Sequence, residues 1–263
     1  MESLDVWPQP EHPLWALESA IAPWRIELEA QILRWADDYD LLDDGVARRR
    51  LADTNLGELI ARSYPAIHHR NIEAVAGWFT WAFVIDDCYE SLVGRPADEY
   101  DELTARTLRV LTPDASILPQ TDSRLDALLA QVWNQLAVSR SEPWRIRFTL
   151  HMMHFLSAFK YEALNRRHRH MPGVLPYTQL RRASGGITTS LDLLEVAHSS
   201  EVPPLLHETE QLGAMFNRAS DFVVWVNDII SLRKEVAAGE TTNGVLILAK
   251  ERNFTLQKAI DSV

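Results

Sequence analysis

The feature that most restricts the fold of this chain is a series of long amphipathic segments joined by short breaks. Apolar residues recur at three- and four-residue steps, as in Ile32, Trp35 and Tyr39, and this spacing is typical of a helix with one buried face. The breaks contain glycine or proline. No segment shows a convincing alternation of the kind that marks a β-strand. The pattern predicts an all-α protein, folded as one antiparallel helical bundle around a common core.

The composition agrees with a helical, globular protein. Glycine contributes only 10 of the 263 residues, which is below its usual share of about 7% and disfavours a β-rich fold with many tight turns. The hydrophobic content of 46% can supply a sizeable core, so intrinsic disorder is excluded. The single cysteine, Cys88, excludes a scaffold stapled by intrachain disulfides. We expect one domain that spans residues 1–263.

Charge and hydropathy limit the partners of the chain. The formal net charge of −11 repels phosphate backbones, so nucleic acid is not an expected partner. The longest uncharged apolar stretch, from Ala74 to Ile85, is shorter than the roughly 20 residues that span a bilayer. The acidic, proline-containing N-terminus lacks the basic start and apolar run of a signal peptide. We therefore expect a cytoplasmic protein without a membrane span.

An apolar stripe between Asn71 and Leu92 ends in three carboxylates, those of Asp86, Asp87 and Glu90. Residues three or four apart share a helical face, so the three acidic groups lie close together. Like charges at this spacing repel one another unless a cation binds among them. A helix end exposed to solvent would explain the acidic groups without a cation. For this motif alone, the solvated helix end is the preferred interpretation.

The segment from Leu212 to Ala238 repeats this arrangement with other polar residues. Its apolar run is followed by Asn227, Ser231 and Glu235, which are spaced four residues apart. Each step of four turns a helix by about 400°, so an amide, a hydroxyl and a carboxylate point in similar directions. Such hard oxygen ligands suit Mg²⁺. A polar surface stripe is the alternative, but the regular spacing, together with the first acidic patch, favours a metal site.

Two sparse oxygen patches indicate a phosphorylated ligand, because Mg²⁺ usually combines one or two carboxylates with substrate phosphates. A diphosphate fits this description. The guanidinium groups of Arg181 and Arg182 can bind its oxygens bidentately. Gly185 and Gly186 then break the helix and expose backbone groups. A solvated arginine pair at a helix end is the alternative interpretation.

Together these motifs resemble those of the bacterial class I terpene synthases. The aspartate-rich motif runs from Asp86 to Glu90 and follows the aromatic run from Trp78 to Phe83. The second motif of that family is complete, and its residues are Asn227, Asp228, Ser231 and Glu235 with the customary lysine, Lys234. The resemblance also includes Tyr161 to Arg166 and Tyr177 to Gly185, so it covers most of the chain. It implies the class I terpenoid synthase fold with a central apolar cavity.

The resemblance implies a metal cluster of three Mg²⁺ ions, with Mn²⁺ as a substitute. Asp86, with Glu90 or Asp87 in support, would bind two of the ions. The third would be bound by the oxygens of Asn227, Ser231 and Glu235.

The resemblance also assigns catalytic residues around the diphosphate. Arg181 matches the diphosphate-sensing arginine of the family, and Arg182 is the rival for this role. Ser184 falls on the linker position and Gly185 on the effector position, where a carbonyl faces the breaking carbon–oxygen bond. Glu162 matches a further acidic residue of the active site.

Aromatic residues near the two motifs are expected to contact the substrate. Aromatic faces stabilise positive charge through their quadrupoles. Phe79 and Phe83 are candidates by helical face, and Trp225 is a candidate because it lies next to the second motif. Lys234 is expected to bind the diphosphate. Most aromatic residues of a helical bundle are simply core, and this is the alternative for each of them.

The implied activity is that of a Mg²⁺-dependent carbon–oxygen lyase of isoprenoid secondary metabolism. Metal ions and cationic side chains would neutralise the leaving diphosphate, so that a linear prenyl diphosphate ionises to an allylic cation. The cation would then be cyclised or quenched. Farnesyl diphosphate is the first expectation for the substrate and geranyl diphosphate the second. The substrate and the product depend on the volume of the pocket, which is set by how several helices meet.

The C-terminal part departs from the pattern of the family. Members normally continue for several helices after the second motif and carry an Arg-Tyr pair, whereas this sequence ends at Val263 without one. We therefore expect a shortened family member whose own activity is in question. We also predict that an apolar face packs poorly unless a partner chain, such as a second copy in a homodimer, covers it. This face is formed by Val245, Leu246, Leu248 and Ala249.

Two other functions stay open at this stage. A chain-elongating prenyl diphosphate synthase would share the bundle, the metals and the diphosphate, but it normally has two aspartate-rich motifs. A catalytically impaired protein that binds prenyl diphosphate would fit the shortened end. The histidine-rich stretches, His151 to His154 and His168 to His170, are compatible with a metal site, but a basic helix end at Arg166 to His170 is the preferred interpretation.

Overall fold

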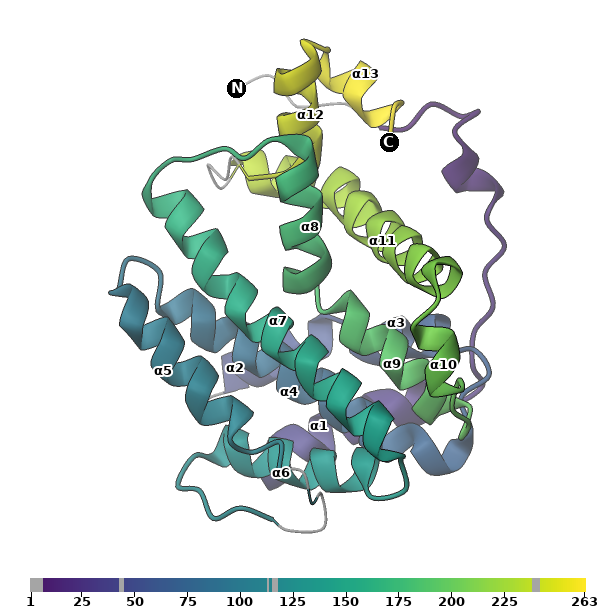
Figure 1. Cartoon of the computed structure of the whole chain (residues 1–263), viewed down its shortest axis with the longest axis vertical. Coiled ribbons are helices and arrows are strands. Elements are labelled where there is room, and N and C mark those ends of the chain that lie inside the picture. Colours follow the sequence, from purple (N-terminus) through teal and green to yellow (C-terminus); the bar gives the residue numbers. More distant parts are fainter. Residues whose placement is uncertain (1–6, 43–44, 113, 115–117, 238–241) are drawn as a thin grey trace. The chain divides into compact units, whose positions relative to one another are not determined.

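The computed structural model describes residues 7–42, 45–112, 114, 118–237 and 242–263. Within these residues all regular elements are helices and no strand occurs, which confirms the all-α class (Figure 1). None of the described helices combines the length and apolar character that crossing a bilayer requires. The central apolar cavity expected from the family stays a prediction.

The chain divides into two compact units. The first, called the α4 unit here, consists of Ser19–Met153 and Thr189–His207. The second, called the α11 unit, combines the N-terminal residues up to Glu18 with His154–Thr188 and Glu208–Val263. The expectation of one domain over residues 1–263 stays a prediction.

More of the described helices lie wholly within the α4 unit than within the α11 unit. Its elements are α1 (Arg25–Asp38), α2 (Gly45–Asp53), α3 (Leu56–Ser63), η2 (His69–Asn71), α4 (Ile72–Ser91), α5 (Ala97–Leu108), α6 (Arg124–Ala137) and α10 (Pro204–His207). Two further helices have residues in both units, and these are α7 (Glu142–Arg167) and α9 (Ile187–Ala197). The α11 unit contains η1 (Pro13–Ala16), α8 (Val174–Ser184), α11 (Glu210–Ala237), α12 (Gly244–Arg252) and α13 (Leu256–Ile260).

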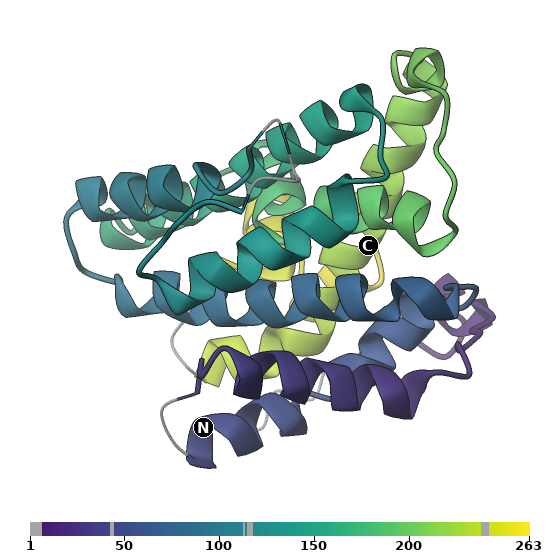
Figure 2. The same cartoon turned by 90° about the horizontal axis from the view of Figure 1, so that it is seen from below.

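The core of the α4 unit is built around α4, which packs against α1 and α6. Figure 2 shows α1, in purple, running alongside α4, in blue. Close approach depends on Gly77, since a Cβ there would lie 2.6 Å from Val132 of α6 and 3.0 Å from the indole nitrogen of Trp35 in α1. Trp81 and Ile85 of α4 are fully buried. This packing fixes the helix that carries the first acidic motif.

The packing of the α11 unit contradicts the expected poor packing of the C-terminal apolar face. Val245 is completely buried in a cluster with Ile229 and Leu232 of α11 and with residues of α13. The other three residues of the predicted exposed face, Leu246, Leu248 and Ala249, pack against the same cluster. The prediction of poor packing without a partner chain was therefore wrong, and the homodimer that it suggested stays a prediction without this support.

The segment that begins at Asn243 also folds as two helices rather than as one. Asn253 adopts a left-handed conformation with φ of 52° and ends α12, and α13 follows after Thr255. This turn folds α13 back onto α12, which allows both helices to bury apolar residues against the end of α11.

A buried ionic network in the α4 unit joins α7, α9 and α10. The completely buried carboxylate of Asp192 accepts one hydrogen bond from Arg147 at 2.9 Å and pairs with His151 at 2.6 Å. Glu195 accepts a hydrogen bond from Arg147 at 2.6 Å and pairs with His207 at 3.1 Å. Because these charges are shielded from water, each depends strongly on its partner. His151, from the first histidine-rich stretch, is thus accounted for by structure.

With a His207→Gln substitution, the free energy of unfolding is expected to fall less at acidic pH than it does in the wild type. Burial and the neighbouring Arg147, with a smaller effect of His151, lower the pKa of His207, while Asp192 opposes them. The unfolded chain therefore takes up a proton at higher pH than the folded chain does. Stability from neutral His207 is present above about pH 6.5 and is lost as the pH falls below it.

Urea unfolding of both proteins from about pH 8 to pH 5 measures this effect. Burial raises the pKa of Glu195, which acts in the opposite direction, so the informative quantity is the difference between wild type and variant. The wild type should lose more free energy of unfolding than the variant as the pH falls. Parallel curves would contradict the role assigned to His207.

Candidate active site

The second motif lies along one side of α11 in the α11 unit. Asn227 is exposed, whereas Ser231 and Glu235 are half-buried. The hydroxyl oxygen of Ser231 is buried and has no hydrogen-bond partner within the described part of the chain. A buried hydroxyl without a partner costs free energy, so this oxygen is suited to bind a further group.

Asp228, between these residues in sequence, organises the site. Its carboxylate is 1% exposed and accepts hydrogen bonds from three residues: the Tyr177 hydroxyl at 2.6 Å, the Gly244 backbone at 3.0 Å, and Arg181 at 3.2 Å from Nη2 and 3.4 Å from Nε. Asp228 is a member of the motif in the sequence, but its position there indicates no role for it. An ionised carboxylate only accepts hydrogen bonds. Asp228 therefore holds the donor groups of Tyr177, Gly244 and Arg181 in place.

Arg181 contacts two residues of the second motif at once. The same Nη2 atom that donates to Asp228 also donates to Asn227 Oδ1, at 2.9 Å. Burial by itself would lower the pKa of Arg181, but the charges of Asp228 and Glu162 and the contact with Tyr177 outweigh it and raise the pKa. The guanidinium is therefore permanently charged and is held beside a predicted metal ligand.

The rival arginine, Arg182, is engaged elsewhere. It forms two parallel hydrogen bonds with the carboxylate of Asp221, at 2.5 and 2.7 Å. This bidentate pair joins Arg182 to a carboxylate outside the second motif. The contacts within the α11 unit thus favour Arg181 over Arg182 as the residue that reaches the second motif.

Glu235 is held by Asn243, the N-cap residue of α12. Its Oε2 atom accepts a hydrogen bond from the side chain of Asn243 at 2.9 Å. The neighbouring Lys234 is exposed. Asn243 was not identified from the sequence, because nothing local links it to a residue eight positions earlier.

The predicted linker and effector residues lie at the end of α8. Ser184 is its last residue and is buried, and its hydroxyl has no hydrogen-bond partner in the described residues. Gly185 keeps an ordinary backbone conformation, whereas Gly186 has φ of +64°, which strains any other residue. The helix therefore ends because of Gly186. Glu162, on α7, is half-buried and belongs to the same unit as Arg181.

The first motif occupies the last turns of α4 in the α4 unit. Asp86 and Glu90 are exposed, and Asp87 accepts a hydrogen bond from Arg50 of α2 at 3.0 Å. Acidic groups near the C-terminal end of a helix are disfavoured by the helix dipole, so a bound cation would relieve them. Burial raises the pKa of Cys88, as expected for a packing residue. That the two motifs face one another stays a prediction.

The predicted aromatic contacts differ in burial. Phe79 and Phe83 are half-buried, and Phe79 makes edge contacts with the rings of Tyr64 and Trp78. Trp225 is also half-buried, and its ring meets that of Tyr177 edge-on at 6.2 Å between centroids. Each of the three therefore combines packing within its unit with some accessible surface.

A Gly244→Ala substitution tests the close contact between α12 and the second motif. A Cβ at Gly244 would lie 2.6 Å from the Trp225 ring and 2.7 Å from Asp228 Oδ2, so the variant should lose about 1–3 kcal/mol of unfolding free energy. The matched control is Gly213→Ala in α11, where a Cβ meets nothing within 4 Å. It should gain about 0.5–1 kcal/mol. Urea unfolding compares the two, and equal effects would contradict the packing argument.

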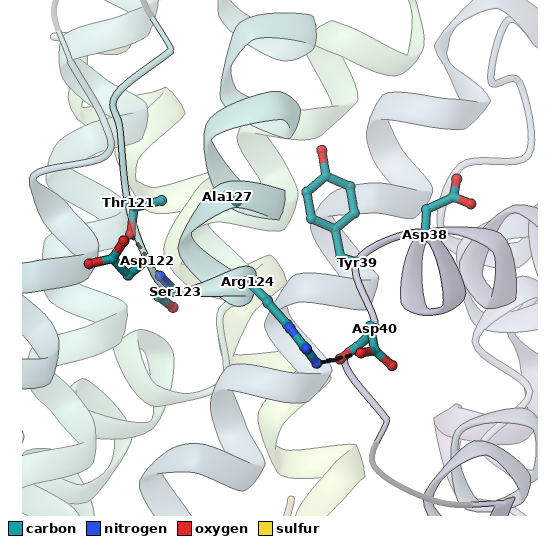
Figure 3. Close-up of a pocket in the computed structure, with 8 residues that line it drawn as sticks. All are labelled: Asp38, Tyr39, Asp40, Thr121, Asp122, Ser123, Arg124 and Ala127. Atoms are coloured by element: carbon teal, nitrogen blue, oxygen red, sulfur yellow. Dashed lines mark hydrogen bonds and ion pairs between the residues drawn. The ribbon is translucent and has the colours of Figure 1, made fainter.

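A separate surface pocket of about 300 Å³ lies in the α4 unit (Figure 3). Figure 3 shows the side chain of Arg124 reaching towards Asp40, with which it forms an ion pair at 2.5 Å. The pocket is lined by Asp38, Tyr39, Asp40, Thr121, Asp122, Ser123, Arg124 and Ala127. It contains none of the predicted site residues.

Comparison with known proteins gives one family match and many relatives. The model of the family described as "Terpene synthase family 2, C-terminal metal binding" matches residues 77–263. The chain is 30% identical over 252 residues to (+)-T-muurolol synthase ((2E,6E)-farnesyl diphosphate cyclizing) of Roseiflexus castenholzii, covering 94% of this chain and 76% of that protein. It is 26% identical to 4-epi-cubebol synthase ((2E,6E)-farnesyl diphosphate cyclizing) of Streptosporangium roseum, covering 93% of this chain and 74% of that protein.

Solved structures share the fold. The crystal structure of a-eudesmol synthase matches with a TM-score of 0.83 at 24% identity, covering 94% of this chain and 79% of that chain. Linalool/nerolidol synthase from Streptomyces clavuligerus matches with a TM-score of 0.81 at 21% identity, covering 93% and 80%. At this level of identity, the likeness establishes the class I terpenoid fold.

Proposed function

The chain belongs to terpene synthase family 2, and on that premise we propose that it ionises a linear prenyl diphosphate to an allylic cation and cyclises or quenches that cation. Farnesyl diphosphate is the proposed substrate, because relatives that cover most of this chain are named for cyclising it. Geranyl diphosphate is the second choice. The observation that carries the proposal is the contact of Arg181 with both Asn227 and Asp228 of the second motif.

The oxygen donors of α11 fit a hard divalent cation. Asn227, Ser231 and Glu235 supply an amide, a hydroxyl and a carboxylate oxygen, and the Ser231 hydroxyl is buried without a partner in the described residues. This donor set suits Mg²⁺, with Mn²⁺ as a substitute. We propose three ions in all, two of them at Asp86 with Asp87 or Glu90. Bound metal would supply positive charge that stabilises the leaving diphosphate.

Arg181 is proposed to bind the diphosphate directly. Asp228, which also accepts the hydrogen bond of Tyr177, holds the guanidinium in place before any substrate arrives, so little reorganisation is needed during the reaction. Lys234, exposed on α11, is proposed to add a second cationic group. Ser184 and the carbonyl of Gly185 are proposed to act with Arg181 in sensing the diphosphate, since they lie at the C-terminal end of the helix that carries Arg181.

The step after ionisation, in which the allylic cation reacts, depends on apolar side chains. An allylic cation is quenched by water, so the cavity around it must exclude solvent. Phe79, Phe83 and Trp225 are proposed to face the cation, where their ring quadrupoles stabilise positive charge without acting as nucleophiles.

A product assay tests the proposal. Purified protein is incubated with Mg²⁺ and geranyl, farnesyl or geranylgeranyl diphosphate, and volatile products are identified by gas chromatography while released diphosphate is measured. Release of diphosphate with a terpene hydrocarbon or alcohol is the expected result. Elongated prenyl chains would instead identify a prenyltransferase, and tight binding of diphosphate without turnover would identify a catalytically impaired binding protein.

A further inference from the structure

The side chain of Asn243 is completely buried and uses both ends of its amide. Its Nδ2 atom donates to Glu235 Oε2 at 2.9 Å and to the backbone carbonyl of Asp228 at 2.8 Å. Its Oδ1 atom accepts from the backbone N–H of Val245 at 2.9 Å, which caps the start of α12. An amide has two N–H donors, so both are engaged with the second motif.

The residue after Asn243 strengthens the same connection. The backbone N–H of Gly244 donates to Asp228 Oδ2 at 3.0 Å. Val245 then inserts its side chain into the apolar cluster with Ile229 and Leu232. The first turn of α12 is thereby fixed to α11 by polar contacts on one side and by apolar packing on the other.

A neutral amide is well suited to orient a metal-binding carboxylate. It accepts no proton and carries no charge, so it holds one oxygen of Glu235 without neutralising the negative charge that a cation requires. The second oxygen of the carboxylate is not used by this contact. Hydrogen bonds that orient metal ligands typically change metal affinity by about 10–100-fold when they are removed.

We propose that Asn243 is a positioning residue that holds Glu235 in its orientation for binding a divalent cation. This inference rests on the proposed function, in which Glu235 is a metal ligand. Asn243 acts through Glu235 and belongs to no part of the motifs that the sequence identified.

The test separates orientation of Glu235 from capping of α12. Serine caps a helix about as well as asparagine, but it lacks the amide that donates to Glu235. Asn243→Ser should therefore keep the cap of α12 and lose only the stability of the two amide hydrogen bonds, so the variant is expected to stay folded. The matched control is Thr255→Ala, which removes the cap hydrogen bond of α13 to Lys258 without touching the second motif. It should lower stability and leave metal dependence unchanged.

The experiment measures the binding of inorganic diphosphate by calorimetry at a series of Mg²⁺ concentrations. Asn243→Ser should raise the Mg²⁺ concentration at half-maximal binding by about tenfold. In a Glu235→Gln background the same substitution should have no further effect, because the two residues act together. An unchanged Mg²⁺ midpoint in Asn243→Ser, or an equal shift in the Glu235→Gln background, would overturn the proposal.

Two further outcomes have a defined meaning. If Asn243→Ser and Asn243→Thr both fail to fold, Asn243 has a purely structural role and the proposal is wrong. If the wild type shows no Mg²⁺-dependent binding of diphosphate, the proposed function itself fails, and the inference about Asn243 fails with it. Wild-type binding with an unaltered variant would reject the positioning role alone.

Discussion

Replacing Asn227 by alanine should reduce kcat/KM by about 10²–10³-fold while leaving the fold intact. The amide of Asn227 is exposed on α11, so its loss creates no cavity. It does remove an oxygen donor proposed for the metal and the acceptor that receives Arg181 at 2.9 Å. Steady-state kinetics with farnesyl diphosphate, together with circular dichroism, measures both parts of this expectation.

A matched control exists on the same helix. Asn217 is also exposed on α11, and Asn217→Ala removes the same amide at a position outside the motif. Its kinetics should equal those of the wild type. Unchanged activity in Asn227→Ala would remove the metal assignment for the second motif, and an equal loss in both variants would indicate a general effect on α11.

An Asp228→Asn variant is expected to lose about 3 kcal/mol or more of unfolding free energy. The substitution keeps the volume of the side chain but removes its charge. Arg181 would then stay charged and largely buried, without the carboxylate that accepts its hydrogen bond at 3.2 Å. Tyr177 and Gly244 would also lose a charged acceptor. Urea unfolding at neutral pH measures the change.

The control for this variant is Asp221→Asn in the same unit. Arg182 and Asp221 form a closer pair, but their side chains are 26% and 28% exposed, so water compensates for the lost contact. The expected loss is about 1 kcal/mol or less. If the two variants were equally stable, burial of Asp228 would not have the energetic importance assigned to it.

The helical class and the position of the second motif were predictable because they depend on local geometry. Residues four apart lie on one side of any α-helix, so Asn227, Ser231 and Glu235 could be placed together from spacing alone. The same reasoning placed Asp86 and Glu90 at the end of one helix. Nothing local, however, distinguished Arg181 from Arg182.

The packing of α12 shows where local reasoning failed. Four apolar residues close together were interpreted as a face that needs a partner chain. Val245 is instead buried against Ile229 and Leu232, because the left-handed turn at Asn253 folds α13 over the same cluster. Apolar pattern indicates that a face must be covered, but it does not indicate which segment covers it.

The helical class, the two oxygen-rich motifs and a family resemblance that the comparisons confirm could all be inferred from the amino-acid sequence. The hydrogen bonds that Asp228 accepts from Tyr177, Arg181 and Gly244, and the contact of Asn243 with Glu235, became known only from the folded chain. Helical periodicity is predictable because it follows from the backbone geometry of neighbouring residues. Burial of a charge and its hydrogen-bond partners depend instead on contacts among α8, α11 and α12, which are distant in sequence and meet only when the chain folds.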